Sequence, residues 1–126
     1  MDKLAYVAGL FNGEGSIFIL KANQTYFLCS SITNTNLPVL TELKELIGGQ
    51  LSEYPQTRKR RAFKLRLESK VAKAFLEKVL PYLRIKREQA KLAIKFQSRK
   101  VNGKRTMTIE KQERYRTRIS ALNFQK

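Results

Sequence analysis

The sequence contains no histidine and only one cysteine, Cys29. These absences exclude histidine-dependent catalytic triads, metal sites with histidine ligands, internal disulfides and cysteine zinc sites. No apolar run approaches the roughly 18 residues of a membrane-spanning helix, and no signal-peptide pattern opens the chain. We therefore expect a soluble intracellular protein without a membrane partner, in which any catalysis depends on carboxylates, lysines and hydroxyls.

Acidic residues are scarce, because 10 Asp and Glu stand against 26 Lys and Arg, which gives a formal net charge of +16. Such a charge on a chain of 126 residues is typical of proteins that bind a polyanion. Nucleic acid is the favoured partner, and a structural protein that binds no nucleic acid is disfavoured. The length predicts a single domain over residues 1–126 with one modest core, so a larger site needs a partner chain.

Hydrophobic spacing predicts an α+β protein in the order αββαββα with helices appended. The core is expected over about residues 1–98 and a C-terminal helical extension over about residues 99–126. The predicted elements are a helix at Lys3–Gly13, strands at Ser16–Lys21 and Tyr26–Thr33, a helix that Asn36 caps and Gly48 and Gly49 end, strands at Gln50–Tyr54 and Arg61–Glu68, a helix that Ser69 caps and Pro81 stops, and helices at Arg87–Ser98 and Thr108–Leu122.

A stripe of small residues, Ala5, Gly9 and Gly13, runs along the first predicted helix, on a different face from its apolar residues. Glycine costs a helix interior about 1 kcal/mol relative to alanine, so this spacing indicates that another backbone approaches closely. A second copy of the helix would fit the stripe, and so would the chain's own sheet. Spacing alone leaves both alternatives open.

Glu14 follows this helix at its negative end, where a carboxylate is slightly unfavourable. If two helices pair along the stripe, two Glu14 carboxylates meet, and divalent cations with oxygen ligands best relieve their repulsion. Such ions can activate water and stabilise a phosphodiester under attack without any histidine. Taken alone, Glu14 could equally be a solvated glutamate in a turn.

Residues 7–15, VAGLFNGEG, resemble the LAGLIDADG motif of homing endonucleases. Similar family segments match ITNT at 32–35, IGG at 47–49 and LPYLRIK at 80–86, so the resemblance covers about residues 1–98. It implies the LAGLIDADG fold, with a curved four-stranded antiparallel sheet in the DNA major groove. It also implies a homodimer that hydrolyses both strands of a long, nearly palindromic double-stranded DNA site and leaves short 3′ overhangs.

The resemblance assigns roles to individual residues. Glu14 and the carbonyl of Gly13 match metal ligands, Asn34 matches a residue that orders active-site water, and Lys86 matches a lysine that stabilises charge or assists the nucleophile. Magnesium is the implied ion, with manganese as a substitute and calcium as an ion that binds without efficient cleavage. Asn34 could instead be a cap residue, and Lys86 a solvated lysine.

Asn12 departs from the motif, which usually carries an acid at this position. Asparagine also forms hydrogen bonds, so we expect the dimer interface to survive, whereas the altered charge beside Glu14 can lower activity. The expected dimer interface consists of Ala5, Ala8, Gly9, Asn12 and Gly13.

Apolar and charged residues alternate in the strand at Arg61–Glu68, so one face should pack against helices and the other should meet the DNA groove. Lys64 and Arg66 are placed to contact base edges, although an ordinary solvated face is the alternative. The faces of Phe18 and Leu20 stay open. Phosphate contacts are expected from the turn residues Arg58, Lys59, Arg60 and Arg61, and further DNA contacts from Ser16, Lys21, Gln24, Tyr26, Ser31, Ser52 and Tyr54.

Two non-catalytic functions remain as alternatives. One is a DNA-binding regulator that uses the same sheet, and the other is an intron RNA maturase, for which RNA would be a partner. The retained Glu14 argues against a purely degenerate protein.

Overall fold

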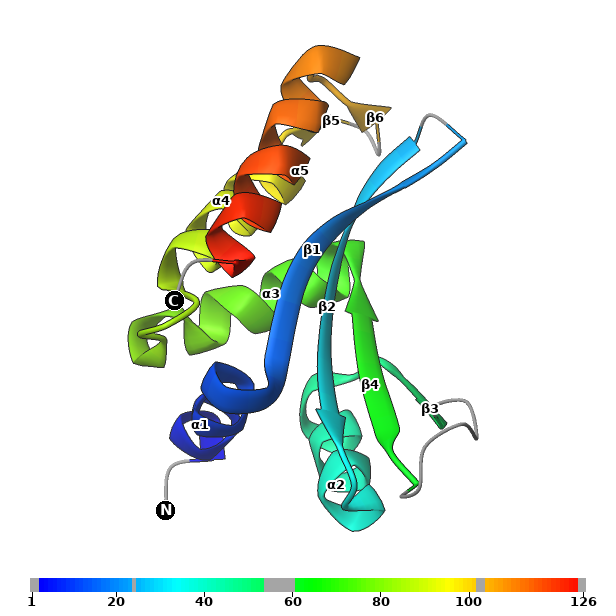
Figure 1. Ribbon diagram of the computed structural model, residues 1–126, viewed down its shortest axis with the longest axis vertical. Coiled ribbons are helices and arrows are strands. Elements are labelled where there is room, and N and C mark those ends of the chain that lie inside the picture. The colour runs from blue at the N-terminus through cyan, green and yellow to red at the C-terminus, as the bar shows by residue number, and fades with distance from the viewer. Residues whose placement is uncertain (1–2, 24, 54–60, 102–103, 125–126) are drawn as a thin grey trace.

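Helices and antiparallel strands alternate along the chain in the predicted α+β order (Figure 1). The structure is a computed structural model that describes residues 3–23, 25–53, 61–101 and 104–124. Its elements are α1 (Lys3–Glu14), β1 (Gly15–Ala22), β2 (Thr25–Asn34), α2 (Leu37–Ile47), β3 (Gln50–Glu53), β4 (Phe63–Glu68), α3 (Ser69–Val79), the 3-10 helix η1 (Leu80–Tyr82), α4 (Arg87–Ser98), β5 (Lys100–Val101), β6 (Lys104–Arg105) and α5 (Ile109–Asn123). The β5–β6 pair lies between the helices predicted at Arg87–Ser98 and Thr108–Leu122, where the sequence analysis predicts no strand.

Capping residues determine where helix α2 begins and ends. The Asn36 side chain accepts a hydrogen bond from the Val39 amide at 3.2 Å, and Pro38 lies in the first turn. Gly48 ends the helix with a φ of 81°, and Gly49 follows with a φ of 101°. A Cβ on Gly49 would lie 2.8 Å from the Arg66 carbonyl oxygen, so only glycine lets β3 come this close to β4.

The predicted cap of α3 is wrong. Strand β4 continues to Glu68, so Ser69 is already the first residue of α3, and no side chain caps this helix. Ser69 makes the turn from strand to helix with a φ of 51°. At α5, by contrast, the Thr108 hydroxyl accepts a hydrogen bond from the Lys111 amide at 3.2 Å, as capping requires.

The four main strands form one antiparallel sheet in the order β1-β2-β4-β3. Side chains alternate between its two faces, and the register places Ser16, Ser31, Arg66 and Gln50 side by side on one of them. We call this the open face. Its members are Ser16, Phe18, Leu20, Ala22, Thr25, Phe27, Cys29, Ser31, Thr33, Gln50, Ser52, Lys64, Arg66 and Glu68.

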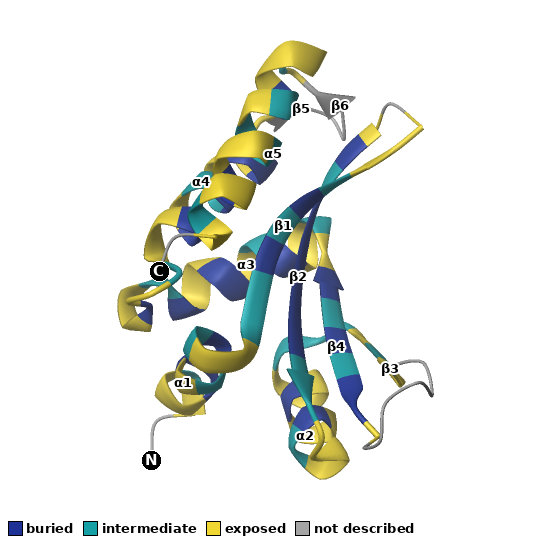
Figure 2. Ribbon diagram, in the orientation of Figure 1, coloured by how far each residue is buried: buried dark blue, intermediate teal, exposed yellow. Residues whose placement is uncertain are grey.

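The opposite face of the sheet carries the hydrophobic core, because Ile17, Leu28, Ile32 and Leu65 are at most 1% exposed there. Helices α1 to α5 all contact the sheet; α3 passes behind β1 and β2, and α4 and α5 lie together to one side of β1 (Figure 1). Figure 2 shows the resulting alternation of buried and partly exposed stretches along β1 and β4. None of the helices in the described ranges is long and apolar enough to cross a membrane.

Helix α5 is fastened to the β1–β2 hairpin through polar contacts. The Tyr26 hydroxyl donates to Glu113 Oε2 at 2.6 Å, and Arg116 Nε donates to both oxygens of this carboxylate at 3.1 Å. Asn123 Nδ2 donates to the Ile17 carbonyl at 2.9 Å. The Arg116 and Tyr26 hydrogen bonds lower the pKa of Glu113 to about 2.

This depressed pKa predicts an acid-sensitive attachment of α5. The ionised Glu113 carboxylate stabilises the folded chain above its usual pKa of 4.5, and the contribution is lost as the pH falls towards about 2. The thermal unfolding midpoint of the wild type should therefore fall more steeply between these pH values than that of Glu113→Gln. Glu110→Gln, which neutralises an exposed acid of the same helix, should keep the wild-type slope. Equal slopes for all three proteins would contradict the attachment.

Candidate active site and DNA-binding face

Helix α1 passes into strand β1 without an intervening loop residue, since one ends at Glu14 and the other begins at Gly15. A Cβ on Gly15 would lie 2.6 Å from the carbonyl oxygen of Phe11 and still closer to the Phe11 ring. Phe11 is fully buried and packs edge-on against Phe75 at 5.0 Å between ring centroids, so it cannot move aside. The bare Gly15 therefore permits the junction that presents Glu14 to solvent.

Asn34, at the end of β2, holds the Glu14 carboxylate. Asn34 Nδ2 donates to Glu14 Oε2 at 3.0 Å, while Asn34 Oδ1 accepts from the Asn36 amide at 2.9 Å. The second bond closes a turn over the asparagine side chain and orients its amide, so that the NH₂ group faces Glu14. Asn34 is thus both a local turn residue and a partner of the candidate catalytic acid.

Lys86 reaches the same end of α1 from the segment before α4. Lys86 Nζ donates to the Asn12 carbonyl at 2.8 Å, which places a cation at the negative end of the helix. Burial lowers the pKa of Lys86. The Asn12 side chain secures the approaching segment, since its Nδ2 donates to the Tyr82 carbonyl at 3.3 Å and its Oδ1 accepts from the Arg84 amide at 3.2 Å.

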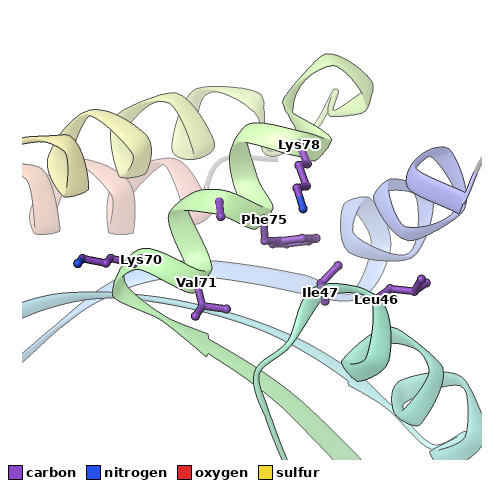
Figure 3. A pocket seen from close by; sticks show the side chains of 7 residues that line it. Leu46, Ile47, Lys70, Val71, Phe75 and Lys78 are labelled. Atoms are coloured by element: carbon purple, nitrogen blue, oxygen red, sulfur yellow. The ribbon is translucent and has the colours of Figure 1, made fainter.

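The structure therefore brings Glu14, Asn34 and Lys86, the three predicted catalytic residues, around one point at the end of α1. A groove of about 310 Å³ lies elsewhere, between α2 and α3, where Figure 3 shows Leu46 and Ile47 facing Val71 and Phe75. Two lysines and no acid line this groove. The exposed end of α1 is accordingly the candidate active site.

One chain offers only part of a metal site. Within residues 3–23, 25–53, 61–101 and 104–124, no three Asp, Glu, Cys or His side chains gather around a point. The donors at the end of α1 are the exposed Glu14 carboxylate and the Gly13 carbonyl, both of them oxygens of the kind that Mg²⁺ and Ca²⁺ prefer. The donor set fits such an ion in chemistry but supplies a single negative charge, so further ligands must come from outside the chain.

The small-residue stripe is uncovered. Ala5, Gly9 and Gly13 are exposed, and a Cβ on either glycine would meet no atom within 4 Å. This excludes the alternative that the stripe packs on the chain's own sheet. Ala8, which was predicted at the dimer interface, does not lie on this surface, because it is 1% exposed in the core, three residues before the buried Phe11. Tyr6, which is 38% exposed beside the stripe, is missing from the predicted dimer interface.

Lys64 and Arg66 lie on the open face, as the alternation predicts, together with the exposed Ser52. Arg66 Nε lies 2.9 Å from Glu68 Oε1, an ion pair whose orientation is not that of a hydrogen bond. Ser31 also faces this side but is only 2% exposed, and its hydroxyl lies 2.7 Å from that of Ser16. Ser16 and Ser31 therefore share a hydrogen bond, and the burial of Ser31 leaves little of its side chain free for the predicted DNA contact.

Two residues predicted to contact DNA at the hairpin tip lie on the helix side of the sheet and not on the open face. Tyr26 is 2% exposed and donates to Glu113 on the helix side of the sheet. Lys21 pairs with Tyr26 on that same side, with its ammonium 5.5 Å from the ring centroid. The exposed Arg61 donates twice to Glu53, at 2.7 and 3.1 Å. Gln24, Tyr54, Arg58, Lys59 and Arg60 lie outside the described residues.

No protein-family model matches the sequence, and no curated protein matches it either. Solved structures do match. I-CvuI, bound to the I-CreI target with 2 mM Mg and the DNA not cleaved, gives a TM-score of 0.77 at 20% identity over 98% of this chain and 83% of that chain. The chain has the fold of the LAGLIDADG homing endonucleases.

Other LAGLIDADG structures agree on the fold. I-CvuI with its target and 2 mM Ca gives a TM-score of 0.65 at 18% identity, over 94% of each chain. The archaeal intron-encoded I-Vdi141I, complexed with DNA, gives 0.66 at 16% identity over 94% of this chain and 97% of that chain. The LAGLIDADG meganuclease I-AabMI, bound to uncleaved DNA, gives 0.60 at 15% identity, and the match covers 77% of this chain but 36% of that one.

The Asn34–Glu14 contact predicts how a second acid would behave at this site. Asn34→Asp keeps the acceptor for the Asn36 amide but sets two carboxylates against each other, at a cost of about 1 kcal/mol in water-like surroundings. In EDTA, the thermal unfolding midpoint of Asn34→Asp should be lower than that of the wild type. Ca²⁺ should raise the midpoint of this variant by more than it raises that of the wild type.

Asn34→Ala is the matched control, because it removes both hydrogen bonds and adds no charge. It should be destabilised equally with EDTA and with Ca²⁺. If Asn34→Asp also responds equally to the two conditions, the oxygens at the end of α1 do not form a cation site.

Proposed function

We propose that the protein is a site-specific endonuclease that cuts double-stranded DNA as a homodimer with a divalent metal. The observation that carries this proposal is the position of Glu14, which lies exposed at the end of an uncovered glycine stripe with Asn34 and Lys86 beside it. The fold adds support, since I-CvuI, I-Vdi141I and I-AabMI were each solved with DNA.

The dimer follows from the uncovered stripe. Two α1 helices can approach closely only where both lack side chains, and Gly9 and Gly13 leave that space. A two-fold axis along the stripe brings two Glu14 carboxylates together, one for each DNA strand.

Each residue of the site has a separate task in this proposal. Glu14 and the Gly13 carbonyl would hold the metal, which when bound activates water and offsets charge on the phosphate. Asn34 keeps one carboxylate oxygen fixed at 3.0 Å and leaves the other to bind the ion. Lys86, anchored to the Asn12 carbonyl, places a positive charge beside the phosphate. We propose magnesium as the ion, with manganese able to replace it.

The open face of the sheet is the proposed DNA-binding surface, with Lys64 and Arg66 turned toward base edges in the major groove. The net charge of +16 supplies affinity for phosphates of any sequence. A two-fold dimer then requires a target with half-site symmetry. A DNA-binding regulator or an RNA maturase would share the basic charge but would not need Glu14.

Removing the Glu14 charge should separate cutting from binding. Glu14→Gln keeps the size of the side chain and its contact with Asn34 but loses the negative charge of the metal ligand. The rate of cleavage of duplexes selected from a randomised library should therefore fall at least 1000-fold, roughly the effect of removing one group that stabilises the transition state electrostatically. Binding in Ca²⁺ should stay within a few-fold of wild type. Glu45→Gln, at an exposed helix position away from the site, is the charge-matched control and should cut normally.

Cleavage by Glu14→Gln near the wild-type rate would refute the metal site. A wild type that binds selected duplexes but cuts none with magnesium or manganese would favour the regulator. Preference for folded intron RNA over duplex DNA would favour the maturase.

A bulky substitution in the stripe should prevent dimerisation without affecting the folding of the single chain. A Cβ on Gly9 would meet no atom within 4 Å in the single chain, and leucine improves helix propensity by somewhat under about 1 kcal/mol, so the Gly9→Leu monomer should fold as well as the wild type. The larger side chain should block helix pairing, and sedimentation should show a monomer without cleavage activity.

Ala121→Leu, at an exposed position on α5, is the control and should remain dimeric. A dimeric Gly9→Leu protein that still cuts DNA would place the interface elsewhere.

A further inference from the structure

The open face of the sheet has an apolar region that the proposed function leaves unexplained. Phe18 and Leu20 of β1 and Phe27 of β2 all lie on this face and are half-buried. Leu20 pairs directly with Phe27, and Phe18 pairs with Cys29, which is fully buried between the strands. Ile17, Ile19 and Leu28 fill the core on the opposite side, so the hairpin is apolar on both faces.

The register orders the open face along its length. At the level nearest the end of α1, Thr33 pairs with Lys64, and at the next level Ser31 pairs with Arg66. Farther out, Cys29 pairs with Glu68, Leu20 pairs with Phe27 at the next level, and Ala22 pairs with Thr25 at the end of the strands. The cations therefore lie close to the candidate active site and the apolar side chains lie away from it.

The apolar region offers DNA no polar group of its own. Between Ser16 and Ala22 of β1, the open-face side chains are Phe18 and Leu20, and neither donates or accepts a hydrogen bond. A base edge buried against them would lose hydrogen bonds to water without replacement, which costs free energy. The thymine C5-methyl is the apolar group that the major groove presents, and Phe is a known type of partner for it.

We propose that Phe18, Leu20 and Phe27 form an apolar reading surface that selects thymine methyl groups in the outer part of each half-site. The proposal rests on the proposed function, because it requires the open face to bind duplex DNA. A strand rises about 3.3 Å per residue, so Leu20 lies about 20 Å along β1 from Glu14. At about 3.4 Å per base pair, the selected thymines should fall roughly 4 to 6 base pairs outward from the cut.

The test uses the homodimeric full chain and duplexes selected from a randomised library in Ca²⁺. Thymines in the selected site are then replaced one at a time by deoxyuridine, which removes only the methyl group. Affinity should fall about fourfold for each outer thymine, the change expected from one buried methyl group. Replacement of inner thymines, at the level of Lys64 and Arg66, should have little effect and serves as the control. Replacing an outer cytosine by 5-methylcytosine should strengthen binding.

Variants assign the effect to the side chains. In Leu20→Thr and in Phe27→Ser, the difference between thymine and deoxyuridine should shrink at outer positions, whereas Lys64→Ala should leave it intact. The DNA-side comparison in the wild type needs no variant, so a folding defect in a variant does not remove the test.

The outcomes separate this proposal from the proposed function. Binding with a preference for G·C at the outer positions, or with no penalty for deoxyuridine there, overturns the reading surface and leaves the endonuclease standing. Specific binding without cutting overturns the endonuclease and leaves the reading surface standing. A protein that binds no duplex DNA overturns both. If a Phe27→Ser protein keeps full thymine discrimination, even when it no longer dimerises, the assignment of Phe27 to the reading surface is overturned.

Discussion

The direct passage of α1 into β1 is the constraint on which the rest of the site depends. Gly15 makes it possible, because a side chain there would overlap the immovable Phe11. The junction places Glu14 at once at the end of the glycine stripe and at the edge of the sheet. The junction also determines which side chains of β1 lie on the open face, because side chains alternate between the two faces of a strand. Through cross-strand pairing, the same choice is passed on to β2 and β4.

Much of the fold, and the position of Glu14 directly after α1, could be predicted because the signals for them are local. Asn36, Gly48 and the alternation in β4 determine nearby backbone geometry, and the motif places Glu14 directly after a helix. The incorrect predictions for Ala8 and Tyr26 have different causes, one within a helix and one between residues far apart in the sequence. Ala8 is small, but it lies three residues before Phe11 and thus shares its buried face. Tyr26 was assigned by its closeness to the hairpin tip, and its partner Glu113 is 87 residues away, beyond any sequence pattern.

The contacts around Asn12 show why the motif tolerates an asparagine. Its side chain donates to the Tyr82 carbonyl and accepts from the Arg84 amide, so both halves of the amide are used. A carboxylate could accept from Arg84 but could not donate to Tyr82. In this chain the asparagine thus fastens the segment that carries Lys86, and the Asn12 carbonyl receives the Lys86 ammonium. Loss of the motif's first acid is therefore compatible with an ordered site.

The Arg66–Glu68 pair bears on how a chain with a net charge of +16 can discriminate between sequences. Cations attract every phosphate, so the charge alone gives affinity without selectivity. Arg66 is different, because it already has a carboxylate partner at 2.9 Å on the open face. To contact a base it must weaken that ion pair, and only an edge with two well-placed acceptors, as in guanine, replaces what is lost. In the proposed complex, a base without them would leave Arg66 with Glu68, so the acid would sharpen the choice that the arginine makes.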